Sequence, residues 1–174
     1  MEDTVPFGSQ VYFLMLALLL FARGMDLLST WIATPNLVLE ANPIAKKLGW
    51  KWGGVLNFVI CLLTAAWPIA AVVLVTTSLL VAARNFKSAW LMRALGETGY
   101  RLWICDALAQ TGVRWLLVSL LGETLLTALV GGAVMLFAGD HEPLLAIGLG
   151  VVAYAFAVTF FTLLSLWRMR RRVG

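Results

Sequence analysis

Long apolar runs alternate with short polar segments along this chain. Four runs are long and apolar enough to cross a bilayer, at about residues 11–33, 54–83, 115–138 and 144–168. At about 1.5 Å per residue a helix of this length spans a hydrocarbon core of about 30 Å, and a single segment in lipid satisfies its backbone groups only as a helix. The pattern therefore predicts an all-α polytopic membrane protein, with four transmembrane helices in one membrane-embedded domain over residues 1–174.

Two polar connections have the pattern of helices that lie in the membrane interface. Asn42-Pro43 is typical of a helix start, an N-cap followed by proline at the first helical position, and predicts a short helix at about 43–52 that ends at Gly53-Gly54. The segment at about 85–110 carries apolar stripes on either side of Gly96, which predict two interfacial amphipathic helices between the second and third spans. A soluble, partner-binding helix pair is the alternative. The 54–83 helix is longer than one crossing requires, and Pro68 is its expected kink.

Composition and charge agree with a membrane location. Residues are 61% hydrophobic and 13% charged, with a mean hydropathy of +0.91, values that exclude an ordinary soluble domain. The net charge of +4 comes from clusters between the apolar runs, a pattern that orients a membrane protein and argues against nucleic acid as a partner. The basic 84–114 linker and the basic C-terminal tail outweigh the lysines near residue 47. We therefore expect a multi-pass protein of the inner membrane with both termini cytoplasmic and the Asp140-His141-Glu142 turn outside.

Charged and polar residues inside the apolar runs form the candidate site. Arg23, Asp26 and Thr30 share one face of the first helix, where a charge facing lipid costs several kcal/mol. Their faces are therefore expected to line the polar interior of a four-helix bundle. In one arrangement Arg23 pairs with Glu123, which leaves Asp26 to meet Asn57 or Glu40. The full candidate intramembrane polar site comprises Arg23, Asp26, Thr30, Glu40, Asn42, Asn57 and Glu123.

The spacing of some of these residues resembles a known motif. Asp26 and Thr30 are followed by Glu40-x-Asn42-Pro43 and an apolar helix. This order is similar to a family of small bacterial and archaeal integral membrane proteins of unknown function, with Asp-x-x-x-Thr in the first helix and Glu-x-Asn-Pro before the second. The resemblance covers about residues 20–83. It implies a membrane architecture and a polar site without an assigned activity.

The partners expected from the sequence are the bilayer and its anionic lipid head groups, together with a membrane-protein partner or a second copy of the chain. Basic residues that flank the apolar runs are the candidate lipid contacts, because such side chains reach toward anionic head groups. They are Lys46, Lys47, Lys51, Arg84, Lys87, Arg93 and Arg101. No cofactor is predicted. No metal site is expected either, because three adjacent residues such as Asp140-His141-Glu142 do not easily converge on one ion.

Three functions are compatible with these patterns. In the first, the buried polar cluster is structural and the protein is a membrane scaffold or assembly subunit. In the second, the deep carboxylates carry a proton or cation through an oligomeric transporter or channel. In the third, the protein is a lipid-modifying enzyme with Asp26, Glu40 or Glu123 as acid or base. The sequence lacks HExxH, GxSxG and a glycine-rich phosphate loop, which disfavours an enzyme.

Overall fold

The computed structural model describes residues 4–170, with the side chains of residues 4–168, and this part of the chain is helical without strands. Its helices are α1 (Gln10–Ala33), α2 (Pro43–Thr64), α3 (Pro68–Thr111), α4 (Val113–Phe137) and α5 (Glu142–Arg170). The helices α1, α3, α4 and α5 are each long and apolar enough to cross a membrane. The prediction of an all-α polytopic membrane protein is therefore confirmed.

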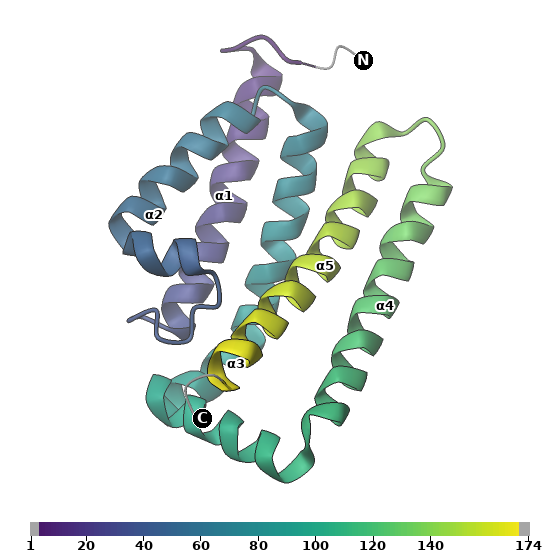
Figure 1. Ribbon diagram of the computed structural model, residues 1–174. Helices are drawn as coiled ribbons and strands as arrows, with labels where there is room; N and C mark the ends of the chain where they lie inside the picture. The colour runs from purple at the N-terminus through teal and green to yellow at the C-terminus, as the bar shows by residue number, and fades with distance from the viewer. Residues whose placement is uncertain (1–3, 171–174) are drawn as a thin grey trace.

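The second predicted span is not one helix, and its bounds of 54–83 are wrong. The helix α2 ends at Thr64 and α3 begins at Pro68, so the chain reverses direction at the turn between them (Figure 1). Proline disfavours a helical conformation at the preceding residue, and Trp67 accordingly has an extended backbone (φ −117°, ψ 94°). The Val5 N–H donates to the Ala66 carbonyl at 2.8 Å, which ties the start of the chain to this turn. Pro68 thus starts a helix instead of kinking one. Residues 4–170 form five helices, four of them long and apolar enough to cross a membrane, so the predicted four-helix bundle is not confirmed.

Two glycines bend the helices near the membrane interface. Gly49 (φ 66°) divides α2 into a short first piece and a longer returning piece, whereas Gly53-Gly54, the predicted bend, lies within the helix. The predicted helix start is present, because the Asn42 side chain accepts the Ile44 N–H at 2.9 Å. Gly96 (φ 69°) breaks α3 as expected. Residues 85–95 continue the long apolar helix, however, and only residues 97–111, here called the surface helix, turn across the end of the bundle (Figure 1).

Successive helices run in alternating directions. The Thr34 hydroxyl, just after α1, donates to Glu97 of the surface helix, while Val5, just before α1, contacts the turn that precedes α3. The helices α1 and α3 therefore run parallel and pack on each other. The helix α2, which lies between them in the sequence, runs in the opposite direction on the outside of this pair (Figure 1). The start of α1 and the end of α5 consequently lie at opposite ends of the bundle (Figure 1). This course disagrees with the prediction that both termini share one side.

Within residues 4–168, the lysines and arginines other than Arg23 and Arg84 lie toward the end of the bundle that contains the loop 34–42, the surface helix and the end of α5 (Figure 1). We call this end the basic end. Lys46, Lys47 and Lys51 belong to it, although the four-span prediction placed them opposite the 84–114 linker. The other end carries the α2–α3 turn and the turn with Asp140 and Glu142.

Close helix contacts depend on small residues. A Cβ atom added at Gly150 of α5 would lie 2.7 Å from the Thr76 Cβ of α3, and one added at Gly131 of α4 would lie 2.8 Å from the Val152 Cγ2 of α5. These distances are shorter than any normal carbon contact, so glycine lets the backbones approach. The helix α5 thereby joins the α1–α3 pair to α4, while α2 packs on the other side.

Candidate functional site

Arg23 is the centre of a polar network between α1, α2 and α3. Its Nε donates to the Asn57 Oδ1 at 2.7 Å, and its Nη2 also donates to that oxygen. Its Nη1 donates to the Asp26 Oδ2 at 2.9 Å and to the Ser78 Oγ at 3.1 Å. Asn57 in turn donates to the Gly53 carbonyl at 2.8 Å. The predicted residues Arg23, Asp26 and Asn57 are therefore brought together, and each has partners within the chain.

Three residues that the sequence analysis missed complete this network. Ser78 and Ser29 are 1% and 0% exposed, and the Ser29 hydroxyl donates to the Asp26 carbonyl at 2.8 Å. Asn85 donates to the hydroxyls of Ser29 and Thr30, each at 3.2 Å. Ser78 and Asn85 are seven residues apart and so share one face of α3. The seven-residue spacing of Ser78 and Asn85 is the signal by which the sequence could have identified this polar face. The face is expected to pack on α1 only when Pro68 is interpreted as the start of a new helix.

Glu40 and Asn42 shape the loop at the basic end. The Glu40 Oε1 accepts the Asn42 N–H at 2.7 Å, and Asn42 caps the Pro43 helix start. Burial raises the pKa of the Glu40 carboxyl above its ordinary value, and the nearby Asp26 charge acts in the same direction, against the Asn42 hydrogen bond and the Lys46 charge. The motif Glu40-x-Asn42-Pro43 is therefore a helix start that also places a second carboxyl group near Asp26.

Glu123 lies apart from the Arg23 network, so the Arg23–Glu123 pair considered from the sequence does not form. The Arg84 Nη1 contacts the Glu123 Oε1 at 2.6 Å, and these side chains are 32% and 49% exposed. This ion pair joins α3 to α4, two helices with little other contact. It lies on an open side of the bundle.

The surface helix is fastened to the loop that follows α1. The Glu97 Oε1 accepts the Thr34 hydroxyl at 3.0 Å and the Asn36 N–H at 2.8 Å. The Trp50 Nε1 donates to the Pro35 carbonyl at 2.8 Å, which attaches the start of α2 to the same loop. The Arg93 guanidinium lies 5.7 Å from the centre of the Trp31 ring, within range of a cation–π contact.

A cavity of about 320 Å³ opens between the loop 38–41, the surface helix and the end of α5. The Arg168 Nη1 donates to the Ala41 carbonyl at 3.1 Å, and the Lys46 Nζ donates to the Val38 carbonyl at 3.2 Å. Burial raises the pKa of the Tyr100 hydroxyl, against the effect of the nearby Arg84 charge. Other polar side chains that line this cavity are Glu40, Arg101 and Ser165.

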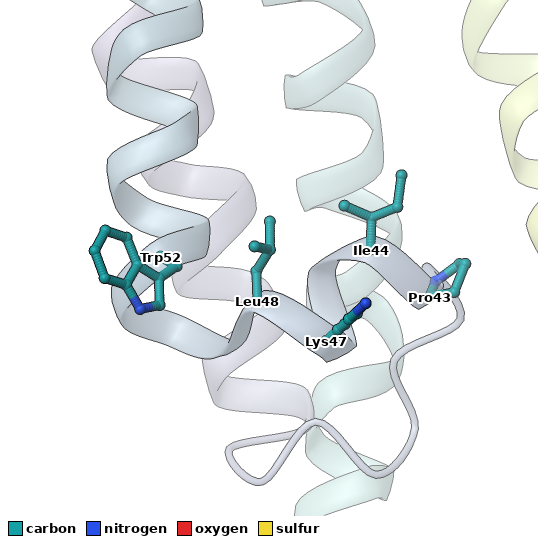
Figure 2. Close-up of a pocket in the computed structure, with 5 residues that line it drawn as sticks. All are labelled: Pro43, Ile44, Lys47, Leu48 and Trp52. Carbon is teal, nitrogen blue, oxygen red and sulfur yellow. The ribbon is translucent and has the colours of Figure 1, made fainter.

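The first piece of α2 has the form expected of an interfacial helix. Figure 2 shows Ile44 and Leu48 on the side of this short helix that faces the body of the bundle, with Trp52 at the start of the returning piece. They line a shallow open depression of about 430 Å³ together with Pro43 and Lys47. Ile44 is 63% exposed and Leu48 is partly exposed, so protein covers the apolar side of this helix only in part. The other exposed candidates for lipid contact are Lys46, Lys51, Lys87 and Arg93.

Comparison with family models, with curated proteins and with solved structures found no match. Within residues 4–168, no three His, Cys, Asp or Glu side chains are arranged so that they could hold a metal ion. The polar features that remain as candidates for a functional role are the Arg23 network, the Arg84–Glu123 pair and the cavity at the basic end.

Proposed function

We propose that this protein is an assembly subunit or scaffold of the inner membrane, which packs against a membrane-protein partner through α3 and α4. The observation that carries the proposal is the half-exposed Arg84–Glu123 ion pair. Glu123 is ten residues from the start of α4, about 15 Å into a hydrocarbon core of about 30 Å. Charges at such a depth are costly toward lipid, and a protein surface over the pair would lower that cost.

The Arg23 network supports a structural role for the polar interior. No buried side-chain nitrogen or oxygen among the described residues lacks a hydrogen-bond partner. A satisfied network fixes which helix faces meet and holds α1, α2 and α3 in register. It contrasts with a transport site, which must exchange its partners with a passing ion.

We further propose that the basic end faces the cytoplasm and the anionic head groups of the inner leaflet. Cytoplasmic segments of membrane proteins carry an excess of lysine and arginine, and the described lysines and arginines other than Arg23 and Arg84 belong to the basic end. In this orientation α1 starts on the outer side and α5 ends on the cytoplasmic side. The turn with Asp140 and His141 is then external.

Proton transport is the second candidate function, favoured by the two neighbouring carboxyl groups Asp26 and Glu40. Burial raises the pKa of Glu40, and its carboxyl lies in the wall of the open cavity at the basic end. A protonatable group between a polar interior and an open cavity is the arrangement that a proton path requires. Under this alternative the cavity is the cytoplasmic entrance.

The assembly proposal is tested by the size of the protein extracted from its own membrane in mild detergent. We expect wild type to elute in a complex larger than the 19.0 kDa chain, and Glu123→Gln to weaken that complex by about tenfold, the loss of one charge-assisted contact. The double variant Arg84→Gln/Glu123→Gln avoids an unpaired arginine and should behave like the single variant. Asp106→Asn removes an exposed carboxylate of the surface helix and should leave the complex intact.

Two results would overturn the assembly proposal. One is a wild-type protein that is monomeric when extracted. The other is a proton flux in proteoliposomes that Asp26→Asn abolishes without changing the size of the extracted protein, which would establish transport. A complex that contains only this chain identifies the partner as a second copy.

A further inference from the structure

The cavity at the basic end contains polar groups that the chain itself leaves unused. Arg101 and Tyr100 of the surface helix and Ser165 of α5 all line it. Within residues 4–168, none of these three side chains has a hydrogen-bond partner. The surface helix and α5 thus contribute three polar side chains without an internal hydrogen bond to the lining of one space.

Hydrogen-bond donors and positive charge exceed acceptors and negative charge around this space. The cations are Lys46, Arg101 and Arg168, and Glu40 is the carboxyl group in the lining. Lys46 and Arg168 each donate once to a carbonyl of the loop 38–41, which fixes their positions. An ammonium has three donor hydrogens and a guanidinium has five, so both keep further donors free. The cavity therefore fits an anion that offers several acceptor oxygens.

We propose that this cavity binds the phosphate group of an anionic membrane lipid, with Arg101 and Arg168 as its principal ligands. Arginine presents paired N–H groups that match two oxygens of one phosphate, and two arginines from different elements would hold it from two sides. Tyr100 and Ser165 also line the cavity, and their hydroxyls would donate to the remaining oxygens. The inference rests on the proposed orientation of the basic end toward anionic head groups.

A lipid is favoured over free phosphate by the walls and the position of the cavity. Val38, Met92 and Ile104 contribute apolar surface beside the charged groups, which suits the glycerol and upper acyl carbons of a lipid. The cavity lies where the apolar part of α3 ends and the surface helix crosses the bundle, the level at which head groups lie. Trp103 of the surface helix is 49% exposed there, as an interfacial anchor would be.

The test measures lipid retention by the full chain, purified in mild detergent and titrated with phosphatidylglycerol or phosphatidylcholine under native mass spectrometry. Wild type should retain phosphatidylglycerol in preference to phosphatidylcholine. Arg101→Gln should weaken phosphatidylglycerol binding by about tenfold, and Arg101→Lys should restore part of it. The matched control is Arg114→Gln, which removes the same charge from an exposed position at the basic end outside the cavity. An unchanged circular dichroism spectrum shows that each variant is folded.

The opposing outcomes are distinct. Equal losses in Arg101→Gln and Arg114→Gln would mean diffuse attraction to the basic end, which overturns the cavity site and leaves the proposed orientation intact. A wild type without preference for phosphatidylglycerol would overturn the proposed contact with anionic lipid as well. If inorganic phosphate binds as tightly as phosphatidylglycerol and equally requires Arg101, the ligand is a free phosphate and the lipid assignment is wrong.

Discussion

Arg23 is the residue on which most polar contacts inside the bundle converge. Its guanidinium contacts oxygens from three helices, those of Asp26, Asn57 and Ser78. An arginine at the depth of mid-helix is tolerated because its charge is paired and its donors are used. Removing any one acceptor leaves an Arg23 N–H donor without a partner. The free-energy cost of that unpaired donor is larger than the net stabilisation that the hydrogen bond provided.

Glu40→Gln is expected to make stability less dependent on pH. Because burial raises the pKa of Glu40 above its ordinary value of 4.5, the folded protein binds this proton more tightly than the unfolded chain does. Protonation of Glu40 therefore contributes fully to the stability of the folded wild type below about pH 4.5. This contribution is lost as the pH rises through the pKa of Glu40 in the folded state. Glutamine stays neutral and its oxygen still accepts the Asn42 N–H.

The measurement is the unfolding midpoint in mixed detergent micelles as a function of pH. The midpoint of Glu40→Gln should exceed that of the wild type by an amount that grows as pH rises above 4.5. Asp106→Asn alters an exposed carboxyl group and should keep a constant difference from the wild type. Parallel curves for Glu40→Gln and the wild type would contradict the argument.

Single residues were predicted more successfully than their partners. Arg23, Asp26 and Asn57 stand out because polar groups are rare within apolar runs, and the structure brings them together. Ser78 was missed because a serine in a membrane helix usually bonds to its own backbone and carries no such signal. The Arg84–Glu123 pair was missed because the sequence does not show which helices are neighbours.

At the scale of the helices, glycine and proline determine where the chain bends and how closely it packs. The turn after α2 has the sequence Ala65-Ala66-Trp67 and is as apolar as the helices that it joins. Hydropathy therefore continues without a break from 54 to 83, and only Pro68 indicates the reversal. A proline inside an apolar run is compatible with a kink or with a helix start, and the structure has the helix start.

Gly131 and Gly132 give a matched pair for testing the packing of α4 on α5. A Cβ atom at Gly131 would lie 2.8 Å from the Val152 Cγ2 and 2.9 Å from the Gly148 carbonyl oxygen, whereas one at Gly132 meets nothing within 4 Å. Gly131→Ala should therefore lower the free energy of unfolding by about 1–3 kcal/mol through overpacking. Gly132→Ala should raise it by up to about 1 kcal/mol, because alanine favours a helix.

Unfolding in mixed micelles by increasing sodium dodecyl sulfate measures both glycine variants against the wild type. Equal effects at the two positions would show that α4 does not pack on α5 through Gly131. The comparison is direct because the two glycines are adjacent in one helix and receive the same methyl group.

At the scale of the whole molecule, the direction of one helix changes the distribution of charge. When residues 54–83 are taken as one span, Lys46, Lys47 and Lys51 fall opposite the other basic segments. When α2 returns before α3 begins, these lysines join the surface helix and the end of α5. The five-helix course is therefore also the one in which the positive-inside rule is obeyed most completely.

Cysteine labelling in intact cells distinguishes the two courses. In a background without Cys61 and Cys105, single cysteines are introduced as Lys47→Cys, Gln110→Cys and His141→Cys. The five-helix course places positions 47 and 110 on one side and 141 on the other. With the basic end in the cytoplasm, a membrane-impermeant maleimide should label only position 141 until the membrane is permeabilised.

Two other labelling patterns would each contradict one part of the proposed topology. External labelling of both 47 and 141, with 110 protected, is the result expected of four spans, and it would mean that α2 and α3 form one crossing. Labelling of 47 and 110 without 141 would preserve the five-helix course and reverse its proposed orientation. The second result would also place the phosphate cavity at the outer leaflet, because Lys46 lies in its lining and next to position 47.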